Sequence, residues 1–325
     1  MTTATSTATP TATLQHGNHS SPHRATDAAS RVDAAPAFRI EPLTVRTGAI
    51  LHGLHIDEDL SDAAITQINQ ALLKHKVVFI RDQQHLSDAA HEAFAARLGP
   101  LLPHPARAPR EDTKAMLNLD SKDTRSSTWH TDLTFLNAFP KISVLRGVTI
   151  PPLGGDTLWA NTATAYAHLP APLKAFVDGL WVRHSNVFDY EALMPAGSAT
   201  SATFHQKLAK RETIETEHPL VCVHPETNER TLLIGHFIKK IIGFSRQDSE
   251  HIFSILHNHV VADENVVRWR WRQGDVAIWD NRATMHRAVD DYGDAERVVR
   301  RVTLEGAPAR AIDGRLSVTQ RGVAA

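Results

Sequence analysis

The chain has 325 residues, 42% of them hydrophobic, and this length can bury the core of one large domain or of two small ones. Its 35 Lys and Arg residues balance its 36 Asp and Glu residues, which excludes a bulk electrostatic attraction to nucleic acid or to an anionic membrane. A single cysteine, Cys222, excludes an internal disulfide and a paired-cysteine zinc motif, and it favours a reducing cytoplasm.

The first 37 residues are rich in Thr, Ala and Ser and contain no aromatic side chain before Phe38. Such a stretch buries too little apolar surface to offset the entropy lost on ordering, so residues 1–37 are predicted to form a disordered tail. They lack the continuous apolar core of a secretory signal, and no later run is long enough to cross a bilayer. A transit peptide is the alternative, and Asp27 and Asp33 count against it because such peptides are poor in acidic residues.

Two helices and a strand are expected next along the chain. The apolar residues of segment 65–73 recur at helical spacing behind a cap at Ser61 or Asp62, which predicts the first helix. The continuous apolar run at residues 77–80 indicates a short buried strand. A second helix is predicted over residues 87–98, where the Gly-Pro pair that follows ends it.

Short β-rich runs dominate the rest of the chain. They lie at residues 142–150, 221–223, 231–234, 266–272, 276–279 and 298–304. Residues 224–229 are predicted to form a hairpin turn, and further helices are expected at 170–181 and 248–259. Because these helices do not alternate regularly with strands, the pattern argues against a doubly wound α/β fold. We expect one domain over residues 38–306 that is mainly β with flanking helices, a jelly roll, followed by a C-terminal tail over residues 307–325.

A candidate metal motif lies at His130-Thr131-Asp132. If this segment is a strand, residues two apart point to the same side, so both His130 and Asp132 enter the core of a barrel. Two imidazoles and one carboxylate on one face are the ligands of non-haem iron(II) sites. The spacing alone is weak evidence in a chain with 20 histidines, and two competing motifs, His55-Ile56-Asp57 and His224-Pro225-Glu226, are interpreted as structural or exposed.

The C-terminal third supplies the remaining groups that such a site needs. His286 follows the predicted strand at 276–279 and is the candidate third ligand. Arg297 and Arg301 are four residues apart in the next strand, so their side chains lie on one face. Burying two guanidinium groups is costly unless each meets an anion. The pattern therefore predicts a site that binds two anionic groups.

Four segments resemble the taurine dioxygenase family. They are residues 129–135 (WHTDLTF), 154–161 (GGDTLWAN), 268–271 (RWRW) and 274–286 (GDVAIWDNRATMH). The resemblance covers residues 38–306 and implies the double-stranded β-helix fold, a jelly roll. It also implies an oxidoreductase, a dioxygenase that requires Fe(II), 2-oxoglutarate as cosubstrate, and O2.

Carried over by position, the resemblance assigns the iron ligands and the cosubstrate anchor. His130, Asp132 and His286 resemble the family's metal triad. Thr157 and Arg297 match the positions that hold the distal carboxylate of 2-oxoglutarate, and Arg297 is expected to bind it in a bidentate manner. No further catalytic residue is expected, because the iron centre supplies the difficult chemistry.

The resemblance also assigns a substrate site. Arg301 matches the arginine that receives a sulfonate or sulfate, and His104 matches a histidine that helps to hold the same group. Phe237 matches an aromatic position of the substrate pocket, and Leu133 is expected to line that pocket too. The implied reaction hydroxylates the carbon that bears the sulfate of an alkyl sulfate ester. The product then collapses to an aldehyde and sulfate, while 2-oxoglutarate yields succinate and CO2.

Two departures from the taurine pattern bear on the substrate. Ser126 and Arg107 stand where taurine enzymes carry an Asn and a Tyr near the substrate amine, which places an amine-binding site in doubt. Four other segments are closer to the alkylsulfatase branch, namely residues 155–163, 180–186, 216–219 and 224–230. A taurine or alkylsulfonate dioxygenase and an aryloxyalkanoate dioxygenase are the alternatives, since arginine accepts sulfonate and carboxylate as readily as sulfate. From other classes, a zinc-dependent hydrolase and a non-catalytic binding protein stay open.

The expected partner is a small anionic substrate, with no nucleic acid and no membrane. The family resemblance implies a homodimer or homotetramer, and the cysteine content favours the cytoplasm. The stretch Arg268-Trp-Arg-Trp-Arg272 looks like a nucleic-acid patch. Strict alternation instead favours a half-buried strand, with its tryptophans on one face and its arginines on the other.

Overall fold

The computed structural model describes residues 38–105, 107–122, 125, 127–188 and 213–320, so the predicted tail at residues 1–37 lies outside the described residues. The helices are α1 (Asp62–His75), α2 (Asp88–Leu98), α3 (Thr162–Ala167), α4 (Ala171–Val177) and α6 (Arg246–Val260), with 3-10 turns at Asn186–Phe188 and Asp263–Asn265. The strands are β1 (Arg39–Pro42), β2 (Ala49–His52), β3 (Val77–Ile80), β4 (Leu117–Asp120), β5 (Ile142–Thr149), β6 (Thr157–Asn161), β7 (Trp181–Ser185), β8 (Glu215–Pro219), β9 (Val221–Val223), β10 (Arg230–Leu232), β11 (Ile238–Ile241), β12 (Val266–Trp269), β13 (Val276–Asp280), β14 (Thr284–Ala288), β15 (Val298–Leu304) and β16 (Val318–Gln320). None of the helices in this described part is long and apolar enough to span a membrane.

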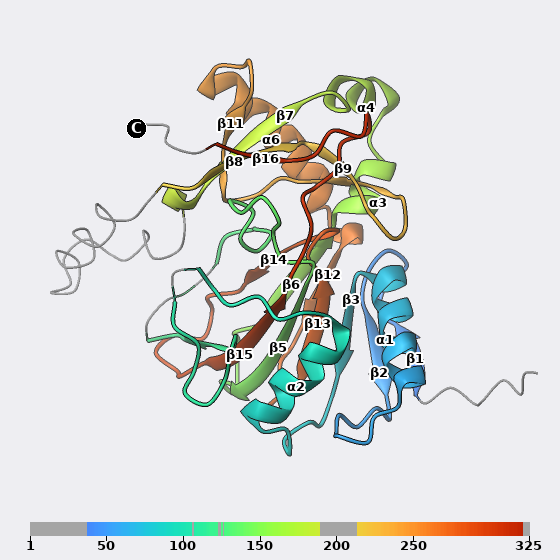
Figure 1. Ribbon diagram of the computed structural model, residues 1–325, viewed down its shortest axis with the longest axis vertical. Coiled ribbons are helices and arrows are strands. Elements are labelled where there is room, and N and C mark those ends of the chain that lie inside the picture. The colour runs from blue at the N-terminus through green and yellow to red at the C-terminus, as the bar shows by residue number, and fades with distance from the viewer. Residues whose placement is uncertain (1–37, 106, 123–124, 126, 189–212, 321–325) are drawn as a thin grey trace, which may run out of the picture. The chain divides into compact units, whose positions relative to one another are not determined.

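The largest sheet has seven strands in the order β1-β2-β3-β13-β5-β15-β4. Its strands β3 and β13 are apolar on both faces, apart from Asp280 at the end of β13, because both faces are covered. In β3, for example, Val78 and Ile80 pack toward the helices, while Val77 and Phe79 belong to a different apolar cluster. Helices α1 and α2 bury their apolar faces against one side of this sheet (Figure 1).

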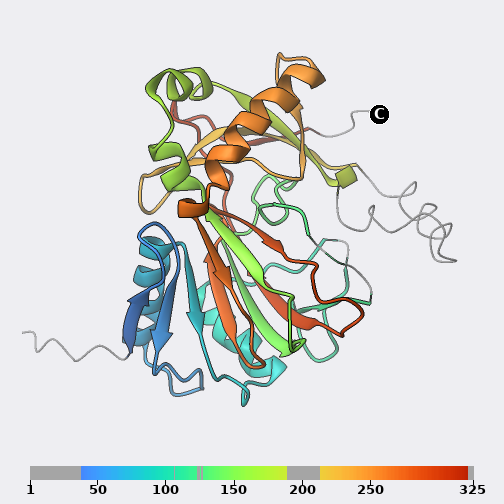
Figure 2. The same ribbon diagram turned by 180° about the vertical axis from the view of Figure 1, so that it is seen from behind.

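A three-stranded sheet, β12-β6-β14, packs on the other side of the large sheet. The apolar layer between the two sheets includes Trp159 from β6, Trp269 from β12 and Trp279 from β13. Figure 2 shows β6 and β12 side by side in front of the strands of the large sheet. All strand pairs of these two sheets are antiparallel except that of β2 with β3, and the two sheets share a core, which is the jelly roll that the sequence predicts.

A third group of elements covers one end of the two sheets. Strands β11-β7-β8-β16 form a four-stranded sheet, and β9 and β10 form a hairpin. Helices α3, α4 and α6 pack there around a separate apolar cluster that contains Leu220, Leu256 and Val260. Strand β16 pairs with β8 along Val318–Gln320. The described part of the expected C-terminal tail, residues 307–320, is therefore paired with the folded domain.

Local sequence signals account for most of the predicted elements. Helix α1 begins after Ser61, whose side chain accepts a hydrogen bond from the backbone of Ala64. The hairpin turn at residues 224–229 joins two antiparallel strands as predicted. The helix predicted over 170–181 is wrong at its C-terminal end, because α4 stops at Val177 and β7 begins at Trp181.

Candidate metal centre and cosubstrate cavity

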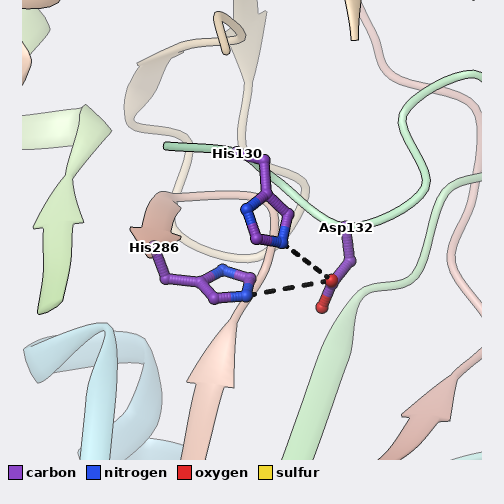
Figure 3. Close-up of side chains that lie close together, drawn as sticks. All are labelled: His130, Asp132 and His286. Atoms are coloured by element: carbon purple, nitrogen blue, oxygen red, sulfur yellow. Dashed lines mark ion pairs between the residues drawn. The ribbon is translucent and has the colours of Figure 1, made fainter. Parts of the chain in front are cut away.

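His130, Asp132 and His286 converge on one point (Figure 3). One potential ligand atom from each residue lies within 4.8 Å of the others, and all three side chains are buried. The Nε2 atoms of His130 and His286 lie 3.6 Å and 3.8 Å from Oδ1 of Asp132. The three groups thus form one compact set of two imidazoles and a carboxylate.

The H-x-D segment reaches this geometry without being a strand. His130 forms an isolated antiparallel bridge with His286 on β14, and the chain then turns at Asp132. The turn requires a left-handed backbone at Leu133, whose φ is 52°. The prediction that a strand aims both ligands is therefore wrong. The bridge and the turn bring the two side chains together instead.

Neighbouring polar groups fix the orientation of the triad. Nδ1 of His130 lies 2.9 Å from the carbonyl oxygen of Thr128, which leaves Nε2 available for a metal. The Ser143 hydroxyl donates to Oδ2 of Asp132 at 2.8 Å. The side-chain amide of Asn281 accepts from the Asp132 backbone N–H at 2.9 Å and donates to the Asp132 carbonyl at 3.1 Å. The carboxylate is thus held from its side chain and from its backbone.

The charges of the triad fit a divalent metal ion. Burial raises the pKa of the Asp132 carboxyl, but the guanidinium of Arg301 and the imidazoles of His286 and His130 together lower it well below its usual range. Burial and the neighbouring His130 lower the pKa of His286. The donor set is therefore an ionised carboxylate with a neutral imidazole at His286, which is the protonation state that binding of iron(II) needs.

A cavity of about 110 Å³ adjoins the triad. Its walls include every residue that the sequence assigns to the metal, the cosubstrate or the substrate, namely His104, His130, Asp132, Leu133, Thr157, Phe237, His286, Arg297 and Arg301. Arg107 lines the cavity too, whereas Ser126 lies outside the described residues. Four arginines and one carboxylate lie among the lining side chains, and two of these arginines are ion-paired, Arg125 with Asp290 and Arg301 with Asp132. The excess of positive charge in the lining favours an anionic ligand.

Arg297 lies deep in the cavity wall and is 8% exposed. Its Nε donates to the Gly155 carbonyl at 2.9 Å, and one terminal nitrogen donates to the Thr157 hydroxyl at 3.3 Å. Burial lowers the pKa of this guanidinium. Among the described residues, no carboxylate lies within ion-pair distance of Arg297, so a bound anion would offset the cost of burying its charge.

Arg301 projects into the same cavity from β15, and Arg297 lies one residue before the start of that strand. It donates to Oδ1 of Asp132 at 2.5 Å, the oxygen that also faces the two imidazoles. Arg300, between the two cavity arginines, points to the opposite face and pairs with Asp88 at the start of α2. Arg297 and Arg301 therefore line one cavity, as predicted, but not as parts of one regular strand, because Arg297 precedes β15 and the register shifts between Val298 and Val299.

The competing motifs lie elsewhere and have structural contacts. The ring of His55 stacks on His85 with centroids 3.7 Å apart. His224 is buried, and its Nε2 lies 2.9 Å from Oδ2 of Asp280. In the alternating stretch 268–272, Trp269 and Trp271 are buried and the arginines are exposed, as predicted.

Sequence reasoning missed Ser143, Asn281 and Tyr292, which support or line the site. Ser143 and Asn281 are ordinary polar residues within a strand and a turn, and only the pairing of β5 with β13 and β15 brings them to the triad. Asn281 does lie within one of the segments of family resemblance, five residues before His286. Its position in that segment was the one signal in the sequence that could have indicated a role for Asn281.

Comparisons with known proteins agree with this geometry. The model of the taurine catabolism dioxygenase TauD, TfdA family matches residues 39–303. An alpha-ketoglutarate-dependent sulfate ester dioxygenase of Pseudomonas putida is 49% identical over 283 residues, which cover 87% of this chain and 94% of the relative. An alkylsulfatase of Acinetobacter baylyi is 48% identical over 270 residues, which cover 83% and 85%.

A solved structure gives the same result for the fold. The crystal structure of a taurine dioxygenase from Burkholderia xenovorans superposes with a TM-score of 0.74 at 38% identity, covering 89% of this chain and 96% of that chain. The family match spans nearly the whole described domain and includes the triad. The chain therefore belongs to the taurine catabolism dioxygenase TauD, TfdA family and is an iron(II)- and 2-oxoglutarate-dependent dioxygenase.

Proposed function

We propose that this dioxygenase oxidises alkyl sulfate esters. In this proposal His130, Asp132 and His286 hold the iron, and Arg297 with Thr157 holds the distal carboxylate of 2-oxoglutarate. The observation that carries the proposal is the shared cavity, in which the buried Arg297, with no carboxylate partner among the described residues, lies near a complete metal triad. A dicarboxylate that bound there could place its other end at the metal.

The other end of the cavity supports a sulfated alkyl chain. Arg301 and His104 supply positive or hydrogen-bonding groups for the sulfate, and Leu133 and Phe237 belong to one buried apolar cluster suited to an alkyl chain. The Arg107 side chain in the wall has no acceptor atom for an ammonium group, which disfavours taurine. The Pseudomonas and Acinetobacter relatives are named for sulfate ester and alkyl sulfate chemistry, and their similarity supports the same substrate class.

The proposed reaction transfers one oxygen atom of O2 to succinate and the other to the substrate carbon. Bound iron would supply the activation of O2 that is coupled to the decarboxylation of 2-oxoglutarate. The carbon that bears the sulfate loses a C–H bond and gains a hydroxyl group. The hydroxylated ester then releases sulfate as its C–O bond breaks, and the hydroxyl proton leaves to give the aldehyde.

In this reaction the protein positions reactants and neutralises charge. Arg297 and Thr157 fix the cosubstrate, and Arg301 fixes the sulfate so that the adjacent carbon faces the metal. The aliphatic and aromatic walls exclude water from the alkyl chain. No hydrolytic base is required, because the sulfate leaves after oxidation rather than after attack by water.

A substrate screen separates this proposal from its alternatives. Enzyme loaded with iron(II) would be given a medium-chain alkyl sulfate, the matching alkylsulfonate, taurine or an aryloxyalkanoate, and succinate would be measured. We expect the alkyl sulfate to give the highest rate. A faster rate with the sulfonate, taurine or the aryloxy acid would reassign the substrate, and sulfate release with zinc and no oxygen would indicate the hydrolase.

Replacing Arg301 tests the sulfate site. The change Arg301→Ala removes a charge-assisted contact, so the KM for the alkyl sulfate should rise about 10- to 100-fold while the Kd for 2-oxoglutarate changes little. Arg300→Ala is the matched control, because Arg300 lies on the other face of the same strand. If Arg301→Ala bound both reactants as the wild type does, the assignment of the sulfate site would fail.

The cellular location and the assembly of the chain belong to the same proposal. The lone Cys222 is buried and unpaired with another cysteine, which is in keeping with a cytoplasmic enzyme. A homodimer or homotetramer stays a prediction from family resemblance. Size-exclusion chromatography with light scattering would measure the mass in solution, and a monomer would contradict that prediction.

A further inference from the structure

The indole N–H of Trp271 donates a hydrogen bond to the proposed cosubstrate anchor from outside the cavity. Nε1 of Trp271 donates to the Thr157 hydroxyl oxygen at 2.9 Å, and the Trp271 side chain is buried. Arg297 donates to the same oxygen at 3.3 Å. Trp271 does not itself line the cavity that holds Thr157 and Arg297. It therefore touches the anchor without reaching the space that a cosubstrate would fill.

These two contacts determine what the Thr157 hydroxyl can still do. A threonine hydroxyl has two acceptor positions and one donor hydrogen. Trp271 and Arg297 both donate, so they use the two acceptor positions and leave the O–H as the remaining function. The Thr157 backbone is fixed on both sides, because it pairs with Trp269 on β12 and with Ala288 on β14. The Thr157 hydroxyl can therefore form a further hydrogen bond only as a donor, which suits an acceptor such as a carboxylate.

Trp271 is held in place by the turn between β12 and β13, through contacts that the protein makes with itself. It follows β12 in the connection to β13, where the backbone N–H of Arg272 donates to Oδ2 of the buried Asp275 at 2.7 Å. The Asp275 carbonyl accepts from Gly147 at 2.9 Å, which ties the turn to β5. Asp275 also pairs with Arg81. The indole is therefore preorganised before a cosubstrate arrives.

Neighbouring tryptophans do not share this contact. Nε1 of Trp159 and Nε1 of Trp279 are buried, and neither has a hydrogen-bond partner among the described residues. Trp159 packs in the same cluster as Trp271, with ring centroids 6.4 Å apart. The donated bond is thus a property of Trp271 and not of the aromatic cluster as a whole.

We propose that Trp271 is a positioning residue for 2-oxoglutarate, which orients the Thr157 hydroxyl as a donor to the distal carboxylate. This inference rests on the proposed function, because it takes Thr157 and Arg297 as the anchor. Without the indole N–H, the hydroxyl would regain an acceptor position and its rotational freedom. The cosubstrate would then bind a less ordered donor, while the sulfate end of the cavity would be unchanged.

The variant Trp271→Phe removes the N–H and keeps an aromatic ring. We expect the Kd for 2-oxoglutarate, measured by calorimetry without oxygen on Mn(II)-loaded enzyme, to rise about three- to tenfold. The KM for 2-oxoglutarate should rise in parallel, and the KM for the alkyl sulfate should stay within about twofold. Trp159→Phe is the matched control, since it removes an N–H without a partner, and it should leave the Kd for 2-oxoglutarate unchanged.

A double-mutant cycle with Thr157→Val separates positioning from a general packing defect. In the Thr157→Val background, Trp271→Phe should have no further effect on 2-oxoglutarate binding, because the hydroxyl that it orients is gone. Additive effects, or an unchanged Kd in Trp271→Phe, would overturn the inference. Wild-type enzyme that bound no 2-oxoglutarate would instead overturn the proposed function, so the two failures are distinguishable.

Discussion

At the scale of single residues, two side chains that are not candidate ligands control the carboxylate of Asp132. Ser143 donates to one carboxylate oxygen. The side chain of Asn281 accepts from the backbone N–H of Asp132 and donates to its carbonyl oxygen. Both groups are buried, so each contact is made in surroundings where water cannot replace it. Supporting contacts of this kind typically change metal affinity by about 10- to 100-fold when they are removed.

The change Ser143→Ala should therefore weaken iron(II) binding without unfolding the protein. We expect a rise of about tenfold or more in the Kd for iron(II), because Oδ2 of Asp132 loses its donor. Anaerobic titration with iron(II) would measure the Kd. Ser249→Ala, at a buried serine of α6 that hydrogen-bonds to the backbone of Ile241, is the control and should leave the metal Kd unchanged. Equal metal affinity in both variants would refute the role of Ser143.

At the scale of elements, one face of strand β15 lines the cavity and its other face contacts helix α2. Arg301 and Val299 line the cavity, and Arg300 faces α2, where it pairs with Asp88. Arg146 of β5 pairs with the same carboxylate. Helix α2 is thus fixed by charge to the back of the strand that carries Arg301.

Beneath these charges, His91 of α2 is completely buried, at 0% exposure. Burial and the neighbouring Arg146 lower its pKa to about 3, against which Asp88 acts in the opposite direction. Because the folded pKa lies below the unfolded value, the unfolded chain binds a proton between the two values that the folded chain does not. The contribution of His91 to the free energy of unfolding is complete at pH values above the unfolded pKa and is lost as the pH falls toward 3.

Urea unfolding at two pH values tests this sign. Between about pH 7.5 and pH 5.5, His91 alone should lower the free energy of unfolding by about 1.4 kcal/mol. The variant His91→Gln should show a drop that is smaller by that amount, since glutamine does not titrate. A wild type and a variant with the same pH dependence would contradict the account of His91.

The sequence predicts those elements whose signals are local. Helix α1 carries its own cap at Ser61, and the alternation along β15 places Val299 and Arg301 at the cavity with Arg300 on the other face. The placement of Asp132 is not local. An isolated bridge to β14 and the side chain of Asn281 set it, and no periodicity in the H-x-D segment reports either contact. Family resemblance strengthened the assignment of Asp132 to the metal, but it assigned no role to Asn281.

At the scale of the whole described molecule, the jelly roll brings distant segments to one cavity. His104 and Leu117 precede the triad in sequence, Phe237 comes from the segment before β11, and Arg297 and Arg301 flank Val299 near the C-terminal end of the domain. The layer between the two sheets ends at this cavity, with Trp279 in both. A rigid apolar support thus lies directly beside a charged and open site, an arrangement that favours the positioning of reactants.

The proposed reaction is an oxygen-dependent oxidation in which the conversion of 2-oxoglutarate to succinate is coupled to the oxidation of a sulfate ester. Its most direct test is to bind iron(II) and 2-oxoglutarate without oxygen, add a medium-chain alkyl sulfate, and then admit O2 while sulfate and succinate are measured. We expect both products to appear together, in equal amounts, and only after oxygen enters. Sulfate released before oxygen, or succinate formed without sulfate, would contradict it.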